Sequence, residues 1–250
     1  MEMVQINKLI DYSAQFLNVG AFRDYCPNGL QVEGRKEIQK VIAGVSASKA
    51  LIEEAIKQDA DLILVHHGYF WKNEEAVITG MKRERIRLLL AHNINLVAYH
   101  LPLDAHPDVG NNAMLAKQLG FTTQYTCAEQ NIMHVGACEL QRLDVLGNRI
   151  ELALARKPLV IGNPNQNISK VAWCTGGAQG YFSEAIKQGV DAFVTGEISE
   201  QMVDMAHESG VAFISAGHYA TEKYGVAALA KHWEAQFNLS INLFYTDNPV

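Results

Sequence analysis

The sequence is poor in cysteine and carries no excess of positive charge. Its four cysteines in 250 residues, Cys26, Cys127, Cys138 and Cys174, include no C-x-x-C pair. A disulfide scaffold is therefore not expected, and a reducing cytoplasm is the simplest location. The formal net charge is −6, which argues against non-specific nucleic-acid binding, because that binding needs many Lys and Arg contacts to phosphate.

Long apolar runs are also missing. No run approaches the ~20 residues that a membrane-spanning helix needs, so no membrane partner is expected. The first residues lack the basic start and the apolar core of a secretory signal. The sequence contains no P-loop and no G-x-S-x-G motif, so the chemistries that depend on those motifs are not indicated.

Apolar residues make up 48% of the chain and charged residues 19%, close to the average of globular proteins. A length of 250 residues suits one large α/β unit or two small domains with a sizeable core. Short apolar runs alternate with helical periodicity, which indicates an α/β fold with a largely parallel sheet. The predicted strands cover residues 30–32, 41–45, 61–65, 95–100, 171–174, 191–195, 211–215 and 241–245.

The stretches between these strands predict helices. A helix is expected over residues 46–58, with Ser46 or Ser48 as its N-cap, and another over 112–119 with Asn111 as its cap. Residues 122–167 break the alternation and include a turn-rich stretch. We therefore divide the chain into a first α/β repeat at 1–121, a connecting insert at 122–167 and a second α/β repeat at 168–250, packed with the first around one site.

The two halves of the sequence resemble each other. The run EAIKQ at 54–58 recurs 130 residues later at 184–188, and at the same offset Asp61 matches Asp191. The five-residue run alone is a weak signal, because its residues are common helix formers. The strands and helices around it follow in the same order, and this agreement predicts an internal duplication.

A His-x-x-x-acid motif follows a predicted strand in each half. His100 and Asp104 lie 118 residues before His218 and Glu222. If His218 opens a helix, Glu222 lies one turn away on the same face, and the two can clamp an ion. Pro102 argues against a regular helix interior in the first motif, so a looser turn is expected there. Each motif alone has an ordinary alternative, such as an acid in a first helical turn or an aspartate at a loop turn.

A His-His pair, His66 and His67, directly follows the strand at 61–65. Neighbouring strand residues point to opposite faces, so both rings can serve one site only where the chain bends, which Gly68 permits. The alternative is two ordinary histidines at a strand end. Ligands of open α/β sheets bind beyond the carboxyl ends of the strands, where all three clusters are expected. Together they predict a metal site.

Four histidines and two carboxylates exceed the three protein ligands of a typical catalytic zinc ion. The set suits two divalent ions roughly 3.5–4 Å apart that share a bridging carboxylate and a water. Asp104 is the expected bridge, because a short carboxylate can bind through both oxygens. Zn, Mn, Fe, Co or Ni are all compatible with nitrogen and oxygen ligands. Such ions would lower the pKa of the bridging water and supply metal-bound hydroxide at neutral pH.

Other residues have weaker claims to a role. Glu197 occupies the repeat position of His67 and is the candidate catalytic residue, which would orient a ligand or move a proton; an ordinary helix-start glutamate is an equal alternative. The basic stretch 82–87 could contact phosphate but is typical of a solvated helix face. The aromatic run 69–71 could stack on a base or pack at a subunit contact. His106 could support the site.

Several motifs together resemble one known family, the YbgI-like dinuclear metal-centre proteins, whose members are often labelled GTP cyclohydrolase 1 type 2 homologues. The resemblance covers nearly the whole chain. The motifs are PNGLQVEG at 27–34, VHHGYFW at 65–71, HLPLDAHP at 100–107, GNN at 110–112, WCTGG at 173–177, DAFVTGE at 191–197 and GHYATE at 217–222.

This resemblance implies two intertwined, duplicated α/β repeats with mixed, largely parallel sheets, and a toroidal homohexamer with metal sites facing its cavity. By resemblance the ligands are His66, His67, Asp104, His218 and Glu222, with His100 at or beside the site. The family label leaves the reaction open.

Two functions compete at this stage. The first is a metal-dependent hydrolase acting on a small, nucleotide-like substrate, either by opening a ring or by attacking phosphorus. The second is a non-catalytic, ring-shaped scaffold or ligand sensor that holds metal. A third possibility is a regulatory partner of another protein, but nothing in the sequence indicates this role.

Overall fold

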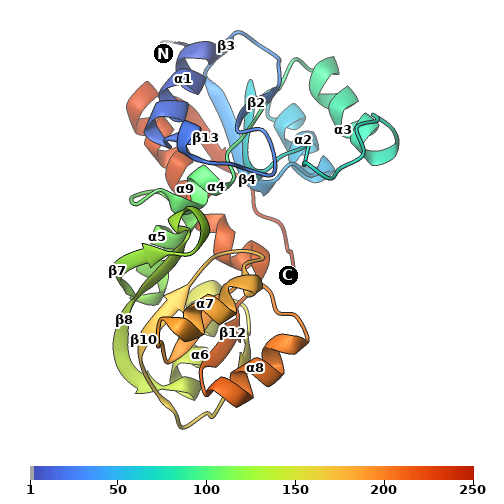
Figure 1. Ribbon diagram of the computed structural model, residues 1–250. Helices are drawn as coiled ribbons and strands as arrows, with labels where there is room; N and C mark the ends of the chain where they lie inside the picture. Colours follow the sequence, from blue (N-terminus) through green and yellow to red (C-terminus); the bar gives the residue numbers. More distant parts are fainter. Residues whose placement is uncertain (1–2) are drawn as a thin grey trace. The chain divides into compact units, whose positions relative to one another are not determined.

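The computed structural model describes residues 3–250 as two compact units (Figure 1). Unit 1 holds the chain up to Leu103 together with Val226–Thr246, and unit 2 holds Asp104–Gly225 together with Asp247–Val250. Residues 1 and 2, the first two of the predicted repeat 1–121, lie outside the described residues. The bounds of these units differ from the predicted segments 1–121, 122–167 and 168–250, because the first unit gives way to the second after Leu103 and Val226–Thr246 belongs to unit 1.

Unit 1 is built on a five-stranded sheet. Its strand order is β13 (Ser240–Leu243), β4 (Lys40–Ser46), β5 (Leu62–His67), β6 (Asn95–Ala98) and β2 (Gly29–Val32). The first four strands run parallel, and β2 pairs antiparallel with β6 at the edge. A separate antiparallel pair joins β1 (Val4–Gln5) to β3 (Glu37–Ile38).

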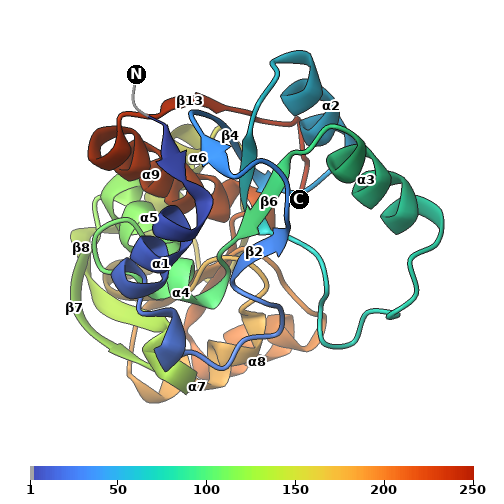
Figure 2. The same ribbon diagram turned by 90° about the horizontal axis from the view of Figure 1, so that it is seen from above.

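Helices cover both faces of this sheet (Figure 2). The helices α2 (Lys49–Lys57) and α3 (Gly80–Ala91) lie on one side, and α1 (Ile6–Phe16) lies on the other with the later part of α9 (His218–Phe237). The central strands are therefore buried on both faces, which explains why they read as continuous apolar runs. The short elements of this part of the chain are η1 (Val19–Ala21) and α4 (Leu101–Ala105).

Unit 2 is built on a six-stranded sheet. Its order is β7 (Thr122–Cys127), β8 (Met133–Arg142), β10 (Asn167–Trp173), β11 (Ala192–Thr195), β12 (Ala212–Ser215) and β9 (Leu159–Ile161). The strands β10, β11 and β12 run parallel, and the other three pair antiparallel. Its helical elements are α5 (Asn111–Leu119), η2 (Glu129–Asn131), α6 (Leu143–Leu154), η3 (Gln179–Tyr181), α7 (Phe182–Lys187) and α8 (Gln201–Ser209).

The stretch 122–167, expected to connect two repeats, is part of the core of unit 2. It supplies β7, β8 and β9 to the sheet, and α6 packs Leu146, Ile150 and Leu154 into the same buried cluster as Val171 and Ile214. Its strands pair antiparallel, so this stretch lacks the strand-helix alternation of the parallel part and yet belongs to the same sheet.

The duplication predicted from the sequence reappears in the strand register. Val41 of β4 pairs with Leu62 of β5, and Val171 of β10 pairs with Ala192 of β11, so both partners are shifted by the same 130 residues. The order β4-β5-β6-β2 in one sheet corresponds to β10-β11-β12-β9 in the other, each ending on an antiparallel edge strand.

The hydrogen bonds that hold these strands are duplicated as well. Asp61 Oδ2 accepts from the backbone N–H of Gln39 at 2.9 Å and of Lys40 at 2.8 Å. Asp191 Oδ2 accepts from the backbone N–H of Ser169 and of Lys170, both at 2.8 Å. Each carboxylate thus holds the backbone of the preceding strand, at the start of β4 and within β10, which explains why aspartate stands at both positions.

The predicted fold class, a mixed α/β protein with largely parallel sheets, is confirmed. Of the two proposed caps of α2, Ser48 is the N-cap, and its hydroxyl accepts from Leu51 N at 3.2 Å. The turn expected after His100 is tighter than predicted, because α4 is helical from Leu101 to Ala105. Pro102 lies in its first turn, where the missing N–H costs no intrahelical bond.

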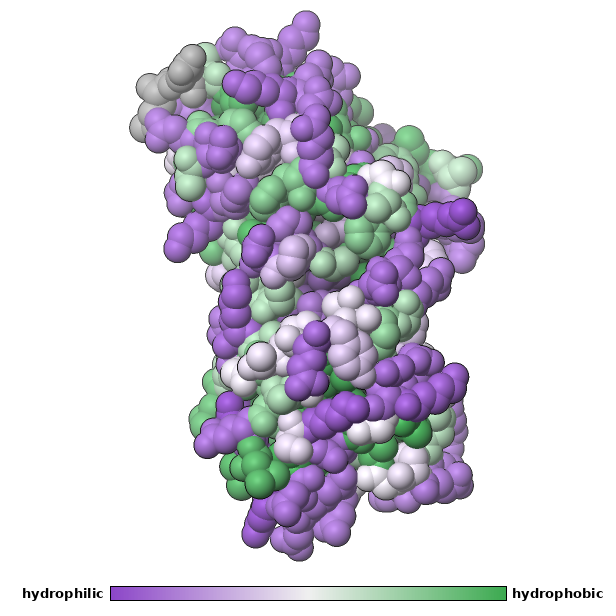
Figure 3. All heavy atoms as spheres, turned by 60° about the vertical axis from the view of Figure 1, so that its left-hand side comes forward, coloured by the Kyte–Doolittle hydropathy of each residue, from purple (hydrophilic) through white to green (hydrophobic). Residues whose placement is uncertain are grey.

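Among the described residues, no helix is long and apolar enough to cross a membrane. On the face seen in Figure 3, hydrophilic residues are mixed with smaller apolar areas. The apolar side chains of the sheets are instead collected in two buried clusters, one beneath α2 and α3 and one beneath α5 and α6.

We expect Asp191→Ala to lower the free energy of unfolding by about 2 kcal/mol, because two strand N–H groups lose their acceptor. Asp61→Ala should have a similar effect at the equivalent position. Urea unfolding measures both changes. The control is Asp204→Ala, an exposed aspartate on α8, for which a change below about 0.5 kcal/mol is expected. Equal effects of Asp191→Ala and Asp204→Ala would contradict the anchoring role.

Candidate metal centre

Three histidines gather at the carboxyl ends of β5 and β6 in unit 1. One ligand atom each of His66, His67 and His100 lies within 4.8 Å of those of the other two. The ring centroids of His66 and His67 are 4.5 Å apart, and those of His66 and His100 are 5.1 Å apart. The two adjacent rings therefore lie close together, although β5 remains a strand through His67.

The sequence suggested that Gly68 permits a bend after this pair, but the structure shows a different need for glycine. A Cβ atom at residue 68 would collide with the side chains of Gln31 and Ala98. The glycine therefore provides room for the close approach of β2 and β6 to the strand end that carries the histidines.

Each histidine of this group is held through its Nδ1 atom. His66 Nδ1 lies 2.9 Å from the carbonyl oxygen of Tyr99, and His67 Nδ1 lies 3.2 Å from Ser46 Oγ. His100 Nδ1 lies 2.7 Å from Asp24 Oδ1. A carbonyl or carboxylate oxygen only accepts, so the rings of His66 and His100 must donate from Nδ1. In a neutral ring, Nε2 is then the nitrogen that carries the lone pair.

An aromatic side chain borders the same histidines. The indole of Trp71 lies edge-on to His100, with ring centroids 5.0 Å apart, and 6.0 Å from the ring of His67. Trp71 is partly exposed, whereas Tyr69 from the same run is buried and donates from its hydroxyl to the carbonyl of Ala47.

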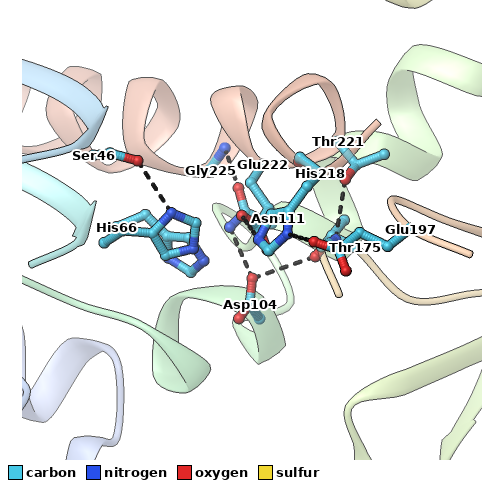
Figure 4. A network of polar contacts seen from close by, with 12 residues as sticks. Ser46, His66, Asp104, Asn111, Thr175, Glu197, His218, Thr221, Glu222 and Gly225 are labelled. Carbon is cyan, nitrogen blue, oxygen red and sulfur yellow. Dashed lines mark hydrogen bonds and ion pairs between the residues drawn. The ribbon is translucent and has the colours of Figure 1, made fainter. Parts of the chain in front are cut away.

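In unit 2, Asp104 is held by side chains from two other elements. Its Oδ1 accepts from Asn111 Nδ2 at 2.8 Å and from Thr175 Oγ1 at 3.3 Å (Figure 4). Asn111 Oδ1 in turn accepts from the backbone N–H of Gly225 at 2.9 Å. Asp104 is only 5% exposed. These bonds fix the orientation of a buried carboxylate, and Asn111 serves this purpose instead of capping α5.

The second histidine-acid pair opens α9, as the spacing predicted. His218 Nε2 lies 3.0 Å from Glu222 Oε2 across one helical turn, and His218 Nδ1 lies 2.7 Å from Glu197 Oε1 (Figure 4). Glu222 is 3% exposed. Glu197 follows β11, so two strand ends and one helix start bring these three side chains together.

Two glycines create the space for this pair. A Cβ at Gly176 would collide with the carboxylate of Glu222, and its φ of +71° is one that other residues rarely adopt. A Cβ at Gly196 would lie 2.6 Å from both Gly176 O and His218 Cα. No side chain therefore fits at the position that corresponds to His66 in the first half.

The carboxylates change the pKa of His218. Burial alone would lower it, but the hydrogen bonds and charges of Glu222 and Glu197 outweigh burial and raise the pKa to about 9. In the metal-free protein this ring is therefore protonated at neutral pH. Burial, with the negative charges of Asp104 and Glu222, raises the pKa of Cys174, so this thiol stays protonated.

The remaining candidates have local roles. His106 Nδ1 accepts from the backbone N–H of Asp108 at 3.2 Å, which stabilises a turn. Lys82, from the basic stretch 82–87, pairs with Glu74 at 3.3 Å and lies over the ring of Phe70. Burial lowers the pKa of His134 to about 4, so this ring is neutral at neutral pH.

Within unit 1 the structure brings together His66, His67 and His100, and within unit 2 it brings together His218, Glu222 and Glu197. The sequence did not reveal that Asp24 and Ser46 contact His100 and His67, or that Asn111 and Thr175 hold Asp104. No spacing pattern marks these partners. Ser46 and Asn111 were noticed only as possible helix caps.

A model of the Duf34/NIF3 (NGG1p interacting factor 3) family matches residues 4–249. A relative from Neisseria meningitidis serogroup B, named GTP cyclohydrolase 1 type 2 homolog, is 52% identical over 249 residues, covering 99% of this chain and 100% of the relative. A relative of the same name from Escherichia coli K12 is 45% identical over 256 residues, with full coverage of both.

Solved structures of similar proteins point to the same family. A structure of the protein ybgI, described as of unknown function, matches with a TM-score of 0.96 and 45% identity over 99% of this chain and 100% of that one. A structure from Thermus thermophilus matches with a TM-score of 0.90 and 34% identity at the same coverage. The family predicted from the sequence motifs is confirmed.

The raised pKa of His218 predicts a pH-dependent stability of the metal-free protein. A folded-state pKa of about 9 against an ordinary 6.5 means that the folded state holds the proton more tightly. The stabilisation is complete below pH 6.5 and is lost as the pH rises through about 9. We therefore expect the stability difference between wild type and His218→Asn, measured by urea unfolding, to shrink over this window.

Glu222→Gln is the companion variant, since it removes the leading cause that raises this pKa. In this background the effect of His218→Asn should depend less on pH. A difference between wild type and His218→Asn that stays constant from pH 6 to 10 would refute the assignment.

Proposed function

The chain belongs to the Duf34/NIF3 family, and from this premise we propose that it is a dinuclear metal-dependent hydrolase acting on a small, nucleotide-like substrate. The observation that carries the proposal is that four histidines share one kind of contact. His66, His67, His100 and His218 each contact a protein oxygen through Nδ1. Metal-binding histidines are typically held in this way, with Nε2 offered to the ion.

We propose that His66, His67, His100, Asp104, His218 and Glu222 together hold two divalent ions. Two arguments support a shared centre. The six ligands exceed the three of a single catalytic zinc, and His100 and Asp104 are only four residues apart across the short helix α4. Nitrogen and oxygen ligands suit Zn, Mn, Fe, Co or Ni.

The chain's own residues prepare this centre. Asn111 and Thr175 hold Asp104 by Oδ1, which fixes the direction of Oδ2, the oxygen that would bind the ions. Glu197 orients His218 and, being partly exposed, can exchange a proton with water. When bound, the ions supply Lewis acidity that makes water a nucleophile at neutral pH.

The position of Trp71 supports a substrate that contains a planar ring. Its indole borders His67 and His100 and is partly exposed, and an aromatic face beside a polar site is suited to stacking on a base. The relatives' name, GTP cyclohydrolase 1 type 2 homolog, favours a purine nucleotide. Ring opening and attack on phosphorus both remain within the proposal.

We further propose a cytoplasmic homohexamer in the form of a ring. All four cysteines are free thiols, which suits a reducing compartment. Three apolar side chains just before and at the start of α3 are 51–78% exposed and offer surface for self-association: Val77, Ile78 and Met81.

The decisive experiment is metal analysis of the purified protein followed by a nucleotide hydrolysis screen. We expect two ions bound by each chain of the wild type. Asp104→Ala should lose at least one ion and reduce turnover by 100-fold or more, since the proposed bridge is gone; this is about 2.7 kcal/mol of transition-state stabilisation. The matched control is Asp108→Ala, an exposed aspartate four residues further on, which should keep both ions and full turnover.

A full metal load with undiminished turnover in Asp104→Ala would refute the assigned role of this carboxylate. The non-catalytic scaffold is tested with the same samples. If chelation dissolves the assembly, as measured by light scattering, and no substrate is turned over, the scaffold function replaces the enzyme.

Stacking on Trp71 can be observed by fluorescence, because Trp173 and Trp233 are 0% exposed. We expect GTP to protect the emission of metal-free protein from acrylamide quenching. Inorganic triphosphate, which lacks the ring, should not protect it. Trp71→Leu should weaken GTP binding about tenfold, in line with the ~1–3 kcal/mol of one stacked base.

The matched control is Phe70→Leu, which changes the neighbouring ring that packs under Lys82 and should leave GTP binding unchanged. Equal protection by triphosphate, or unaltered GTP affinity in Trp71→Leu, would rule out the stacking role.

A further inference from the structure

We propose that Asp24 is a positioning residue of the metal centre, acting through His100. This inference rests on the proposed function, since it concerns how one ligand of that centre is held. Asp24 lies in the segment before β2 and belongs to none of the metal-ligand motifs of the sequence. Its role follows from the contacts of its two carboxylate oxygens.

The carboxylate of Asp24 is buried and fully engaged. Its side chain is 4% exposed. Oδ1 accepts from His100 Nδ1 at 2.7 Å and from the backbone N–H of Tyr25 at 2.6 Å. Oδ2 accepts from Asn28 Nδ2 at 2.8 Å and from the backbone N–H of Leu101 at 2.9 Å. Four donors directed at two oxygens hold this carboxylate in one orientation.

Two of these bonds control the same ligand. The bond to the imidazole fixes the rotation of the His100 ring and requires Nδ1 to be the protonated nitrogen, so Nε2 is left to bind metal. The bond to Leu101 N fixes the backbone that follows His100. Asn28 Oδ1 completes the arrangement by accepting from the backbone N–H of His100 at 2.8 Å. Side chain and backbone of His100 are thus held from one short segment.

Asp24 could instead be a metal ligand itself. Asp24, Cys26 and His100 also offer ligand atoms within 4.8 Å of one another. Against this role, an ion at that point would have to displace the His100 proton and compete with three N–H donors that already occupy the carboxylate. The contacts therefore favour a hydrogen-bonding role for Asp24, with His100 as the ligand.

The same device occurs in the second half of the chain. Glu197 accepts from Nδ1 of His218 at 2.7 Å, as Asp24 does from His100. The partners of His66 and His67 are an uncharged carbonyl and a hydroxyl. A carboxylate partner makes an imidazole a stronger donor to metal, and in each half of the chain one histidine has such a partner.

The test measures zinc affinity of the assembled protein by competition with a chromophoric chelator, and needs no substrate. We expect Asp24→Asn to weaken zinc binding roughly 10- to 100-fold, the usual loss when such a partner is removed. His100→Ala should weaken binding at least as much. The double variant should bind zinc like His100→Ala alone, because Asp24 acts only through that ring.

Asp59→Asn is the charge-matched control, since Asp59 is exposed and pairs with Arg35 at 2.6 Å; its zinc affinity should equal that of the wild type. The cobalt(II) absorption spectrum at saturating metal gives a second measurement. It should change in Asp24→Asn and not in Asp59→Asn. If Asp24→Asn does not fold, Asp24→Glu takes its place, with the same non-additivity expected.

Several results would overturn the proposal. One is an Asp24→Asn variant that binds zinc and cobalt like the wild type. Another is a loss of zinc affinity on Asp24→Asn that is as large in the His100→Ala variant as in the wild type. Loss of one equivalent of zinc in Cys26→Ser would make Asp24 and Cys26 ligands instead. A wild type that binds no zinc or cobalt defeats the proposed metal centre and this inference with it, whereas a metal-binding wild type with an unaffected Asp24→Asn defeats this inference alone.

Discussion

The candidate site depends on one constraint: each imidazole is held by a protein oxygen at Nδ1. A histidine at a strand end could rotate freely and lose its orientation in solvent. The oxygens of Tyr99, Ser46, Asp24 and Glu197 prevent this rotation. Because three of them can only accept a hydrogen bond, they also decide which nitrogen carries the proton. The orientation of the rings is therefore determined by the folded chain itself.

Much of the fold could be predicted from the sequence because its signals are local. Strands buried on both faces appear as short apolar runs, and the helices between them show a different period. The match between Asp61 and Asp191 was visible as a repeat and proved to be a pair of equivalent strand anchors. The position of His218 and Glu222 on one helical face followed from their spacing alone.

The remainder depends on contacts between residues far apart in the chain. Asp24 and His100 are separated by 76 residues, and Asn111 and Gly225 by 114, so no periodicity connects them. The last strand, β13, joins the first sheet beside β4, which sequence order alone does not indicate. An asparagine before a helix could cap that helix or bond elsewhere, and only the folded chain decides between the two.

Gly196 limits how far the two halves of the chain can resemble each other. Their strands are equivalent in register, but the second half cannot carry a histidine at the position of His66, because no Cβ fits between Gly176 O and His218 Cα. A side chain at residue 196 would require the backbone at residues 176 and 218 to move. No single substitution at this position can therefore make the two halves alike, and each half has to supply different groups to its strand ends.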